Sequence, residues 1–211
     1  MKIIYDPPKL IKSVFHKAYW ETKNNKLLLT FDDGPTKEAT EKILRELADH
    51  KIKSLFFCVG NNLRKEPSLV KEILSEGHEI GNHTYNHKTL WFSNKGKIEN
   101  EILSFEQESF KKQNGNSKYF RPVRGRIDFN LYNTLIDLNF KIVMWSLLTL
   151  DYKNDLNIVK FAVTKFLKKN SIIVLHDNIK SSKIITDSIK YIAESADNSG
   201  FEFGVPSECL K

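Results

Sequence analysis

Short apolar runs alternate with amphipathic stretches along most of the chain. The runs Lys26–Phe31 and Ile52–Val59 are short and strongly apolar, as expected of buried strands. Between them, Thr36–His50 carries apolar residues at the spacing of one helix face: Ala39, Ile43, Leu44 and Leu47. Because parallel strands need a crossover connection, this order predicts a β-α-β unit.

The same alternation continues to the end of the chain. Further helices are predicted over Asn62–Glu76, Lys97–Lys112, Asp128–Leu138, Leu156–Lys168 and Lys183–Ser195. Further strands are predicted over His78–Asn82, Tyr119–Arg121, Phe140–Ser146, Ser171–His176 and Phe201–Val205. Asp128 is expected to be the N-cap of its helix.

About seven strands therefore follow one another without a linker rich in Pro, Gly or Ser. This pattern indicates an α/β fold in a single domain, with a mostly parallel sheet that is either open or closed into a barrel. We assign residues 1–25 to an N-terminal lead-in segment and residues 26–211 to the domain.

Composition excludes several classes of protein. Of 211 residues, 40% are hydrophobic and 28% are charged, which excludes a disordered or fibrous chain. Lys and Arg number 33 against 26 Asp and Glu, so the formal net charge is +7. The lysines are scattered and lack interleaved aromatic residues, so we expect no nucleic-acid partner.

The chain also lacks the patterns that mark membrane and secretion segments. No run approaches the ~18 apolar residues of a membrane-spanning helix. The first residues have neither the apolar core nor the cleavage site of a secretion signal. We expect a cytoplasmic protein, or one exported with a signal that this sequence does not contain. Cys58 and Cys209 are expected to be free thiols, and no pattern indicates an obligate protein partner.

Chemically active residues follow the carboxyl ends of the predicted strands, where β/α proteins collect their functional groups. In chain order these residues are Asp32 and Asp33, His83 and His87, Arg121, Asp151 and His176.

Two of these strand ends together predict a cation site. His83 and His87 are four residues apart, so on a helical turn both imidazoles would point the same way. Asp32 or Asp33 is the candidate carboxylate. Two histidines and one carboxylate suit a hydrolytic zinc centre, and the same set can hold iron(II) for oxygen chemistry. His176 is then a candidate general acid.

Simpler interpretations of these residues stay open. His83 and His87 would then be ordinary polar histidines, and His176 a polar residue at a strand exit. A turn followed by a helix explains Gly34 and Pro35, but a helix cap needs only one of the two preceding aspartates.

The motifs resemble those of the polysaccharide deacetylase family, also called carbohydrate esterase family 4. Thr30–Pro35 (TFDDGP) is similar to the first family signature, and Gly77–His87 (GHEIGNHTYNH) to the second. The similarity runs from about Lys26 to His176. It implies a distorted (β/α) barrel, and it makes residues 26–211 the catalytic domain.

The resemblance also implies roles for individual residues. Asp32 would be the general base, and His176 the catalytic acid. The ligands of a divalent metal would be Asp33, His83 and His87, with zinc the leading metal and cobalt, nickel or manganese as alternatives. A backbone N–H near Arg124 would stabilise the oxyanion, and Arg121 would tune the base.

This chain departs from two of the family signatures. The third usually reads Arg-Pro-Pro-aromatic-Gly and here is Arg121–Gly125 (RPVRG). In the fourth, Asp-x-x-Asp-Trp, Leu148 replaces the first acid and Tyr152 the tryptophan. The lost acid would orient Arg121, so we expect the retained Asp151 to take over that pairing.

Three further side chains are expected to line a substrate cleft: Trp145, Leu175 and Tyr152. For Trp145 and Leu175 a purely structural place in the core is an equal alternative.

The resemblance as a whole implies a metal-dependent hydrolase that deacetylates N-acetylated amino sugars in a glycan, such as peptidoglycan or a chitooligosaccharide. Its partner would be that acetylated glycan. Three alternatives stay open: an esterase for O-acetyl groups in a xylan-like polymer, a glycan-binding module that has lost catalysis, and an iron oxygenase.

Overall fold

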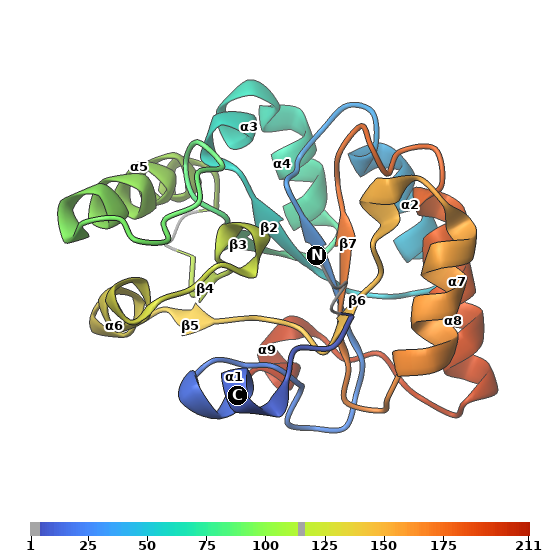
Figure 1. Ribbon diagram of the computed structural model, residues 1–211. Coiled ribbons are helices and arrows are strands. Elements are labelled where there is room, and N and C mark those ends of the chain that lie inside the picture. Colours follow the sequence, from blue (N-terminus) through green and yellow to red (C-terminus); the bar gives the residue numbers. More distant parts are fainter. Residues whose placement is uncertain (1–4, 114–116) are drawn as a thin grey trace.

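Seven parallel strands form one sheet in the computed structural model, which describes residues 5–113 and 117–211 (Figure 1). The strands are β1 (Leu28–Asp32), β2 (Leu55–Cys58), β3 (Glu79–Asn82), β4 (Tyr119–Phe120), β5 (Lys141–Ile142), β6 (Leu147–Leu148) and β7 (Ile172–His176). Their order across the sheet is β5-β4-β3-β2-β1-β7-β6. The sheet is open between β5 and β6, so it forms a half-barrel, which confirms the distorted (β/α) barrel.

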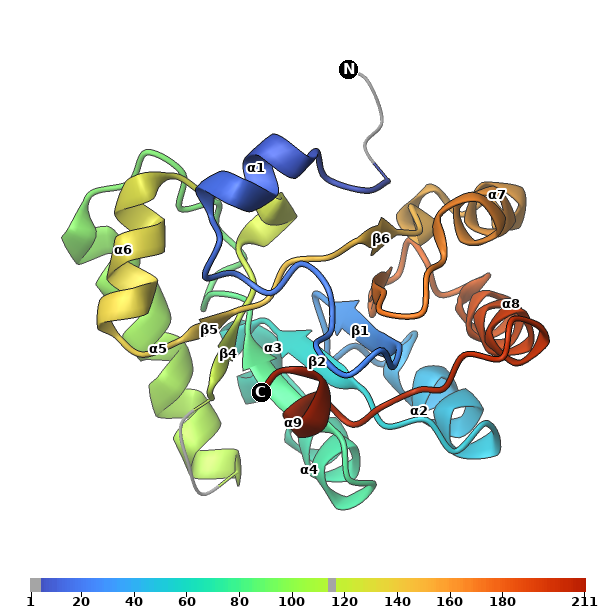
Figure 2. The same ribbon diagram turned by 90° about the horizontal axis from the view of Figure 1, so that it is seen from below.

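Helices pack around this curved sheet, most of them on its outer face, and the last one lies across its inner side, where Cys209 packs with Leu28 and Leu55 (Figure 2). Within the described residues they are α1 (Lys9–Val14), α2 (Thr40–Asp49), α3 (Gly60–Lys65), α4 (Pro67–Ser75), α5 (Lys95–Gln113), α6 (Phe129–Asp137), α7 (Leu156–Phe166), α8 (Ile185–Asn198) and α9 (Pro206–Cys209). Two 3₁₀ turns, η1 (Val123–Gly125) and η2 (Asp151–Lys153), follow β4 and β6. In the described part of the chain, no helix combines the length and apolar content needed to cross a membrane.

The core explains why the strands are apolar throughout. All five residues of β1 are buried, because β1 lies between β2 and β7 in the middle of the sheet. Apolar faces of α2 and α8 pack on one side of the sheet through Ile43, Leu47, Ile189 and Ile192. A second cluster joins α5 and α6 to β4 and β5.

The N-terminal segment is part of the same folded unit. Phe15 and Trp20 belong to the second core cluster. The N–H of Tyr19 donates to the carbonyl of Ile142, and the N–H of Met144 donates back to the carbonyl of Tyr19, both at 2.8 Å. Residues 5–25 of the predicted lead-in segment therefore pack into the domain, and residues 1–4 lie outside the described residues.

Two of the predicted elements are wrong. The helix predicted over residues 62–76 is divided into α3 and α4, because Pro67 starts a new helix at its first position. Residues 201–205 form no strand; they contribute a single bridge from Phe203 to Leu27. The seventh strand is β6 instead, whose two residues are too few for a periodic pattern to reveal.

The register of the sheet brings the carboxyl ends of separate strands together. Asp32, the last residue of β1, pairs with His176, the last residue of β7. Asn82 at the end of β3 pairs with Phe120 at the end of β4, so His83 and Arg121 follow side by side. The residues singled out in the sequence therefore lie along one edge of the sheet.

We predict that Asp128→Ala lowers the free energy of unfolding by about 1–2 kcal/mol. Asp128 is the N-cap of α6, and its Oδ1 accepts from the N–H of Leu131 at 2.9 Å. Urea unfolding measures the effect, with Asp128→Asn as the matched control, because asparagine caps helices as well as aspartate. Equal losses in the two variants would contradict the capping role.

Candidate active site

Asp32 and Asp33 leave the end of β1 in different directions. Oδ1 of Asp32 lies 2.7 Å from Nη1 of Arg121. Asp33 has a left-handed backbone (φ 80°), a conformation that aspartate tolerates better than most residues, and its Oδ1 faces the histidines. The chain thus gives two adjacent carboxylates two separate environments.

His83 and His87 come together through a loop. Residues 83–87 do not form a helical turn: they follow β3 without helical hydrogen bonding, and both Thr84 and His87 have positive φ. The two rings are nevertheless 5.3 Å apart between centroids. Nδ1 of His83 lies 2.8 Å from the carbonyl oxygen of Arg121 and donates to it, which leaves Nε2 as the free ring nitrogen.

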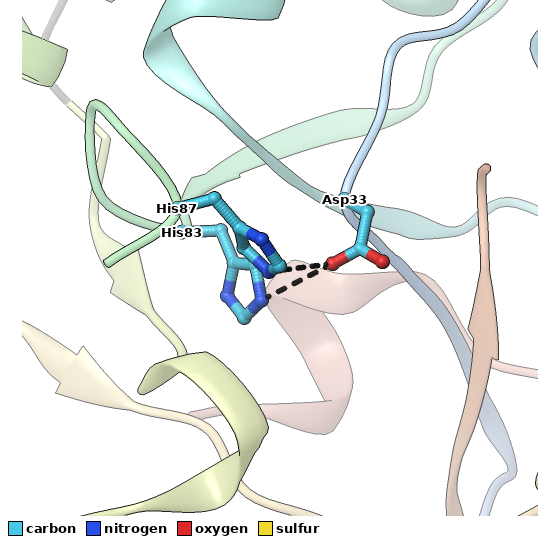
Figure 3. A group of neighbouring side chains, drawn as sticks. All are labelled: Asp33, His83 and His87. Atoms are coloured by element: carbon cyan, nitrogen blue, oxygen red, sulfur yellow. Dashed lines mark ion pairs between the residues drawn. The ribbon is translucent and has the colours of Figure 1, made fainter. Parts of the chain in front are cut away.

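Three side chains converge on one point between β1 and β3 (Figure 3). Oδ1 of Asp33 is 3.0 Å from Nε2 of His87 and 3.7 Å from Nε2 of His83. Ligands held at 2.0–2.2 Å around a tetrahedral zinc ion lie about 3.3–3.6 Å apart, so these spacings fit one small cation. Among residues 5–113 and 117–211, this is the one group of three or more His, Cys, Asp or Glu side chains that meet closely enough to share an ion. Asp33, rather than Asp32, supplies the carboxylate of this group.

The environment of Asp33 favours its anionic form. Burial alone would raise its pKa, but a hydrogen bond from His87 and the charges of His176, His83 and His87 lower the pKa well below its usual range. Asn178 fixes the second oxygen, because its Nδ2 donates to Oδ2 at 2.7 Å. Oδ1 is therefore directed at the Nε2 atoms of His83 and His87, and the three atoms together could bind a cation.

Arg121 is buried completely and holds Asp32 in place. Its Nη1 donates to Oδ1 of Asp32 and to Oγ1 of Thr30, both at 2.7 Å. Its Nε donates to the carbonyl of Val143 at 3.0 Å, and its Nη2 to the carbonyl of Met144 at 2.9 Å. The guanidinium is fixed by four hydrogen bonds and one opposite charge, as a buried ion requires.

The predicted pairing of Asp151 with Arg121 is wrong. Oδ1 of Asp151 accepts from Nδ1 of His176 at 2.8 Å, and Oδ2 accepts from the backbone N–H of His176 at 2.7 Å. The turn η2 follows β6, the neighbour of β7, so it brings Asp151 to His176. With leucine at position 148, the carbonyls of Val143 and Met144 supply the remaining acceptors of Arg121.

The contact with Asp151 stabilises the protonated form of His176. Burial alone would lower the pKa of His176, but the charge and hydrogen bond of Asp151, with smaller contributions from Asp33 and Asp32, raise the pKa to about 9. The edge of Tyr152 packs against the imidazole with 4.9 Å between ring centroids. His176 is therefore protonated at neutral pH with Nδ1 held by Asp151.

The remaining predicted residues lie in different environments. Arg124 has an exposed side chain and a left-handed backbone (φ 57°) inside η1. Trp145 is half-buried against Gly125, where a Cβ would come within 2.2 Å of its ring. Tyr152 borders His176, and 36% of it is exposed. Leu175 is fully buried in the main core cluster, so its assignment to a cleft is wrong.

The sequence predictions missed the residues that support the two aspartates. Thr30 and Asn178 act through the contacts above, and Asp177 is buried under the β1 loop. Hydroxyls of Thr36 and Thr40 donate to the Asp177 carboxylate at 2.9 and 2.6 Å. Burial raises the pKa of Asp177 to about 7, despite these hydrogen bonds. Because Asp177 directly follows His176, the sequence could have indicated that it lies at the site. No sequence feature indicated Asn178.

Comparison with known proteins points to one family. The sequence model described as polysaccharide deacetylase matches residues 20–143. A peptidoglycan-N-acetylglucosamine deacetylase of Bacillus cereus is 33% identical over 197 residues, which cover 91% of this chain and 92% of that protein. A second Bacillus cereus protein of that name is 43% identical over 125 residues, but these cover 59% of this chain and 46% of the relative. This chain thus aligns with about half of the second relative.

A solved structure shows the same fold. It is a peptidoglycan N-acetylglucosamine deacetylase in complex with 4-naphthalen-1-yl-N-oxidanyl-benzamide. The TM-score is 0.89 at 31% sequence identity, and the superposition covers 97% of each chain.

We predict that the cluster of Asp33, His83 and His87 binds one divalent cation per chain, for which zinc is the probe. His83→Ala should weaken zinc binding by at least about tenfold, because it removes a ligand whose ring is already oriented by Arg121. Calorimetric titration of the metal-free protein with zinc measures both the number of ions bound per chain and the affinity. His16→Ala, which removes an exposed histidine, is the matched control. Equal affinity in the two variants would contradict the assignment.

Proposed function

Because this chain belongs to the polysaccharide deacetylase family, we propose that it is a metal-dependent hydrolase that removes acetyl groups from N-acetylglucosamine residues of a glycan. The names of its relatives support peptidoglycan as the glycan. One observation carries the proposal: the cluster of Asp33, His83 and His87 lies at the same sheet edge as a held carboxylate, Asp32, and a held imidazolium, His176.

The donor set of this cluster fits a divalent ion. Two imidazole nitrogens and one carboxylate oxygen are the ligands of hydrolytic zinc sites, and cobalt, nickel or manganese can use the same set. When bound, such an ion supplies a Lewis acid that polarises the acetyl carbonyl and lowers the pKa of water. Asp33 and His83 would hold it from oriented positions, since Asn178 and the Arg121 carbonyl fix them. His87, 39% exposed, leaves the site open to solvent on one side.

Asp32 is placed to act as general base. Arg121 fixes Oδ1, so Oδ2 is the oxygen that can take a proton from the attacking water. The carboxylate is buried, with 8% of its side chain exposed, and its orientation is set by the ion pair.

His176 is placed to act as general acid. Asp151 accepts from Nδ1, so the proton on Nε2 is the one available for the departing amine. Transfer of this proton leaves acetate and a free amino sugar as products. The left-handed backbone of Arg124 would turn its N–H toward the oxyanion of the tetrahedral intermediate.

We predict release of acetate from a tetramer of N-acetylglucosamine by the zinc-loaded protein. Chelation of the metal should abolish it, and Asp32→Asn should reduce kcat by about 10²–10⁴-fold, because the amide cannot take a proton. Asp187→Asn, at an exposed acid on α8, is the control. Because the amide leaves the charge of Arg121 uncompensated, circular dichroism and zinc binding check that the variant is folded.

The same assay separates the alternatives. Tight binding of glycans without acetate release from any acetylated substrate would support a binding module. Release from O-acetyl xylan alone would support an esterase, and turnover that needs iron and oxygen would support an oxygenase. Each of these results would contradict the proposed function.

We predict that Asp151→Asn moves the basic limb of the kcat/KM profile to lower pH by at least about one unit. The wild-type limb should lie near pH 9, where His176 loses its proton. The amide keeps a hydrogen bond but removes the charge that stabilises the imidazolium, so less of the acid form is present at pH 8. The other groups that face His176 are Asp32, Asp33 and Tyr152, and they are unchanged in this variant. Asp155→Asn, an exposed charge on the same segment, is the control, and an unmoved limb would contradict the role of Asp151.

A further inference from the structure

Two neighbouring aromatic rings are exposed on the loop that follows the metal-site histidines. Of Phe92, 80% is exposed, and of Trp91, 43%. Their rings are stacked, with 4.5 Å between centroids and 28° between planes. The guanidinium of Arg126 lies over the Trp91 ring at 5.4 Å from its centroid. An exposed pair of aromatic rings leaves apolar surface in contact with water, and such surface often marks a binding site.

The loop that carries these rings is a fixed structure. The N–H of Ser93 donates to the carbonyl of Leu90 at 3.1 Å, which closes a tight turn around the two aromatic residues. Leu90 is buried in the second core cluster. Two bonds tie the turn to α6: the N–H of Phe92 donates to Oδ2 of Asp128 at 2.6 Å, and Nδ2 of Asn130 donates to the carbonyl of Ser93 at 2.7 Å.

Phe92 adopts an unfavourable backbone conformation to present its ring. Its φ is 55°, in the left-handed region, where turns normally use glycine or asparagine. A bulky aromatic residue there costs free energy, and such strain is concentrated at binding and catalytic sites. The bond to Asp128 holds this conformation. Folding alone therefore does not explain an aromatic residue at this position.

The aromatic pair lies close to the proposed reaction centre. Trp91 is four residues after His87, so their backbones are at most ~14 Å apart. Arg126 is two residues after Arg124, the residue whose N–H is assigned to the oxyanion, and it contacts Trp91 directly. The loop after β3 and the loop after β4 are thus in contact at Trp91.

The size and surroundings of the pair fit a sugar ring. The axial C–H groups of a pyranose form an apolar face that packs on an aromatic ring, while its equatorial hydroxyls stay hydrated or accept from cations. Two stacked rings with the exposed guanidinium of Arg126 over Trp91 match that mixture. A stable protein interface needs about 800 Å² per partner with an apolar centre, far more than two side chains provide.

We propose that Trp91 and Phe92 form a glycan subsite that binds a pyranose of the same chain, a few sugars from the one that is deacetylated. This inference rests on the proposed function and extends it, because it makes the enzyme selective for chains over monosaccharides. The subsite supplies binding energy at a distance from the reacting acetyl group.

The test compares chain lengths. For the zinc-loaded protein we expect kcat/KM for the N-acetylglucosamine tetramer to exceed that for the monosaccharide. In the double variant Trp91→Ala/Phe92→Ala the ratio of the two values should fall about tenfold, mainly through a higher KM for the tetramer. Trp91→Phe should keep most of the ratio. Phe161→Ala removes an aromatic of 54% exposure on α7 and is the matched control.

A binding measurement keeps this inference separate from the proposed function. Titration of the tetramer into zinc-loaded Asp32→Asn protein needs no turnover, and adding the double substitution should weaken binding about tenfold. If the double substitution weakens binding of the tetramer but the zinc-loaded wild-type protein releases no acetate, the proposed function is overturned and the glycan subsite is supported. An unchanged length ratio and unchanged binding would overturn the subsite, whether or not acetate is released.

Discussion

One buried ion pair organises the active-site edge of this half-barrel. The guanidinium of Arg121 is fully buried and is balanced by Asp32 at the end of the central strand. Removing either partner would leave an unpaired buried charge, which costs about 3–5 kcal/mol. The same residue orients His83 through its backbone carbonyl, and its side chain binds the carbonyls of Val143 and Met144. Arg121 thus contacts both the proposed general base, Asp32, and a proposed metal ligand, His83, so a shift of Arg121 would disturb both.

The division of labour between neighbouring aspartates follows from this arrangement. Asp32 is committed to the guanidinium, while Asp33 turns through a left-handed backbone toward the imidazoles. A second carboxylate–base pair, Asp151 with His176, lies on the other side of β1 because β7 is its neighbour. In the proposed reaction, Asp32 and His176 thus have different charged partners, Arg121 and Asp151, which suits separate roles as base and acid. The leucine at position 148 does not break this scheme, because backbone carbonyls complete the environment of Arg121.

Local pattern predicted the strand–helix alternation and the edge at which the chemistry gathers, because both depend on residues close in sequence. Periodicity could not reveal β6, which has two residues, and it wrongly favoured a strand at residues 201–205, where Phe203 makes one bridge only. Pair contacts between distant segments were the weakest predictions. Asp151 binds His176 and not Arg121 because of the order of β6 and β7 in the sheet, which the sequence does not specify. The support of Asp33 by Asn178 is likewise a tertiary contact without a sequence signal.

The proposed function requires one divalent ion held by Asp33, His83 and His87 near the carboxyl ends of β1 and β3. Anomalous diffraction at the zinc edge, from crystals of the zinc-loaded protein, tests this most directly. We expect a single strong peak at about 2.0–2.2 Å from Nε2 of His83, Nε2 of His87 and Oδ1 of Asp33, with Nδ1 of His83 still bound to the Arg121 carbonyl. A peak elsewhere, or zinc held without Asp33, would contradict it.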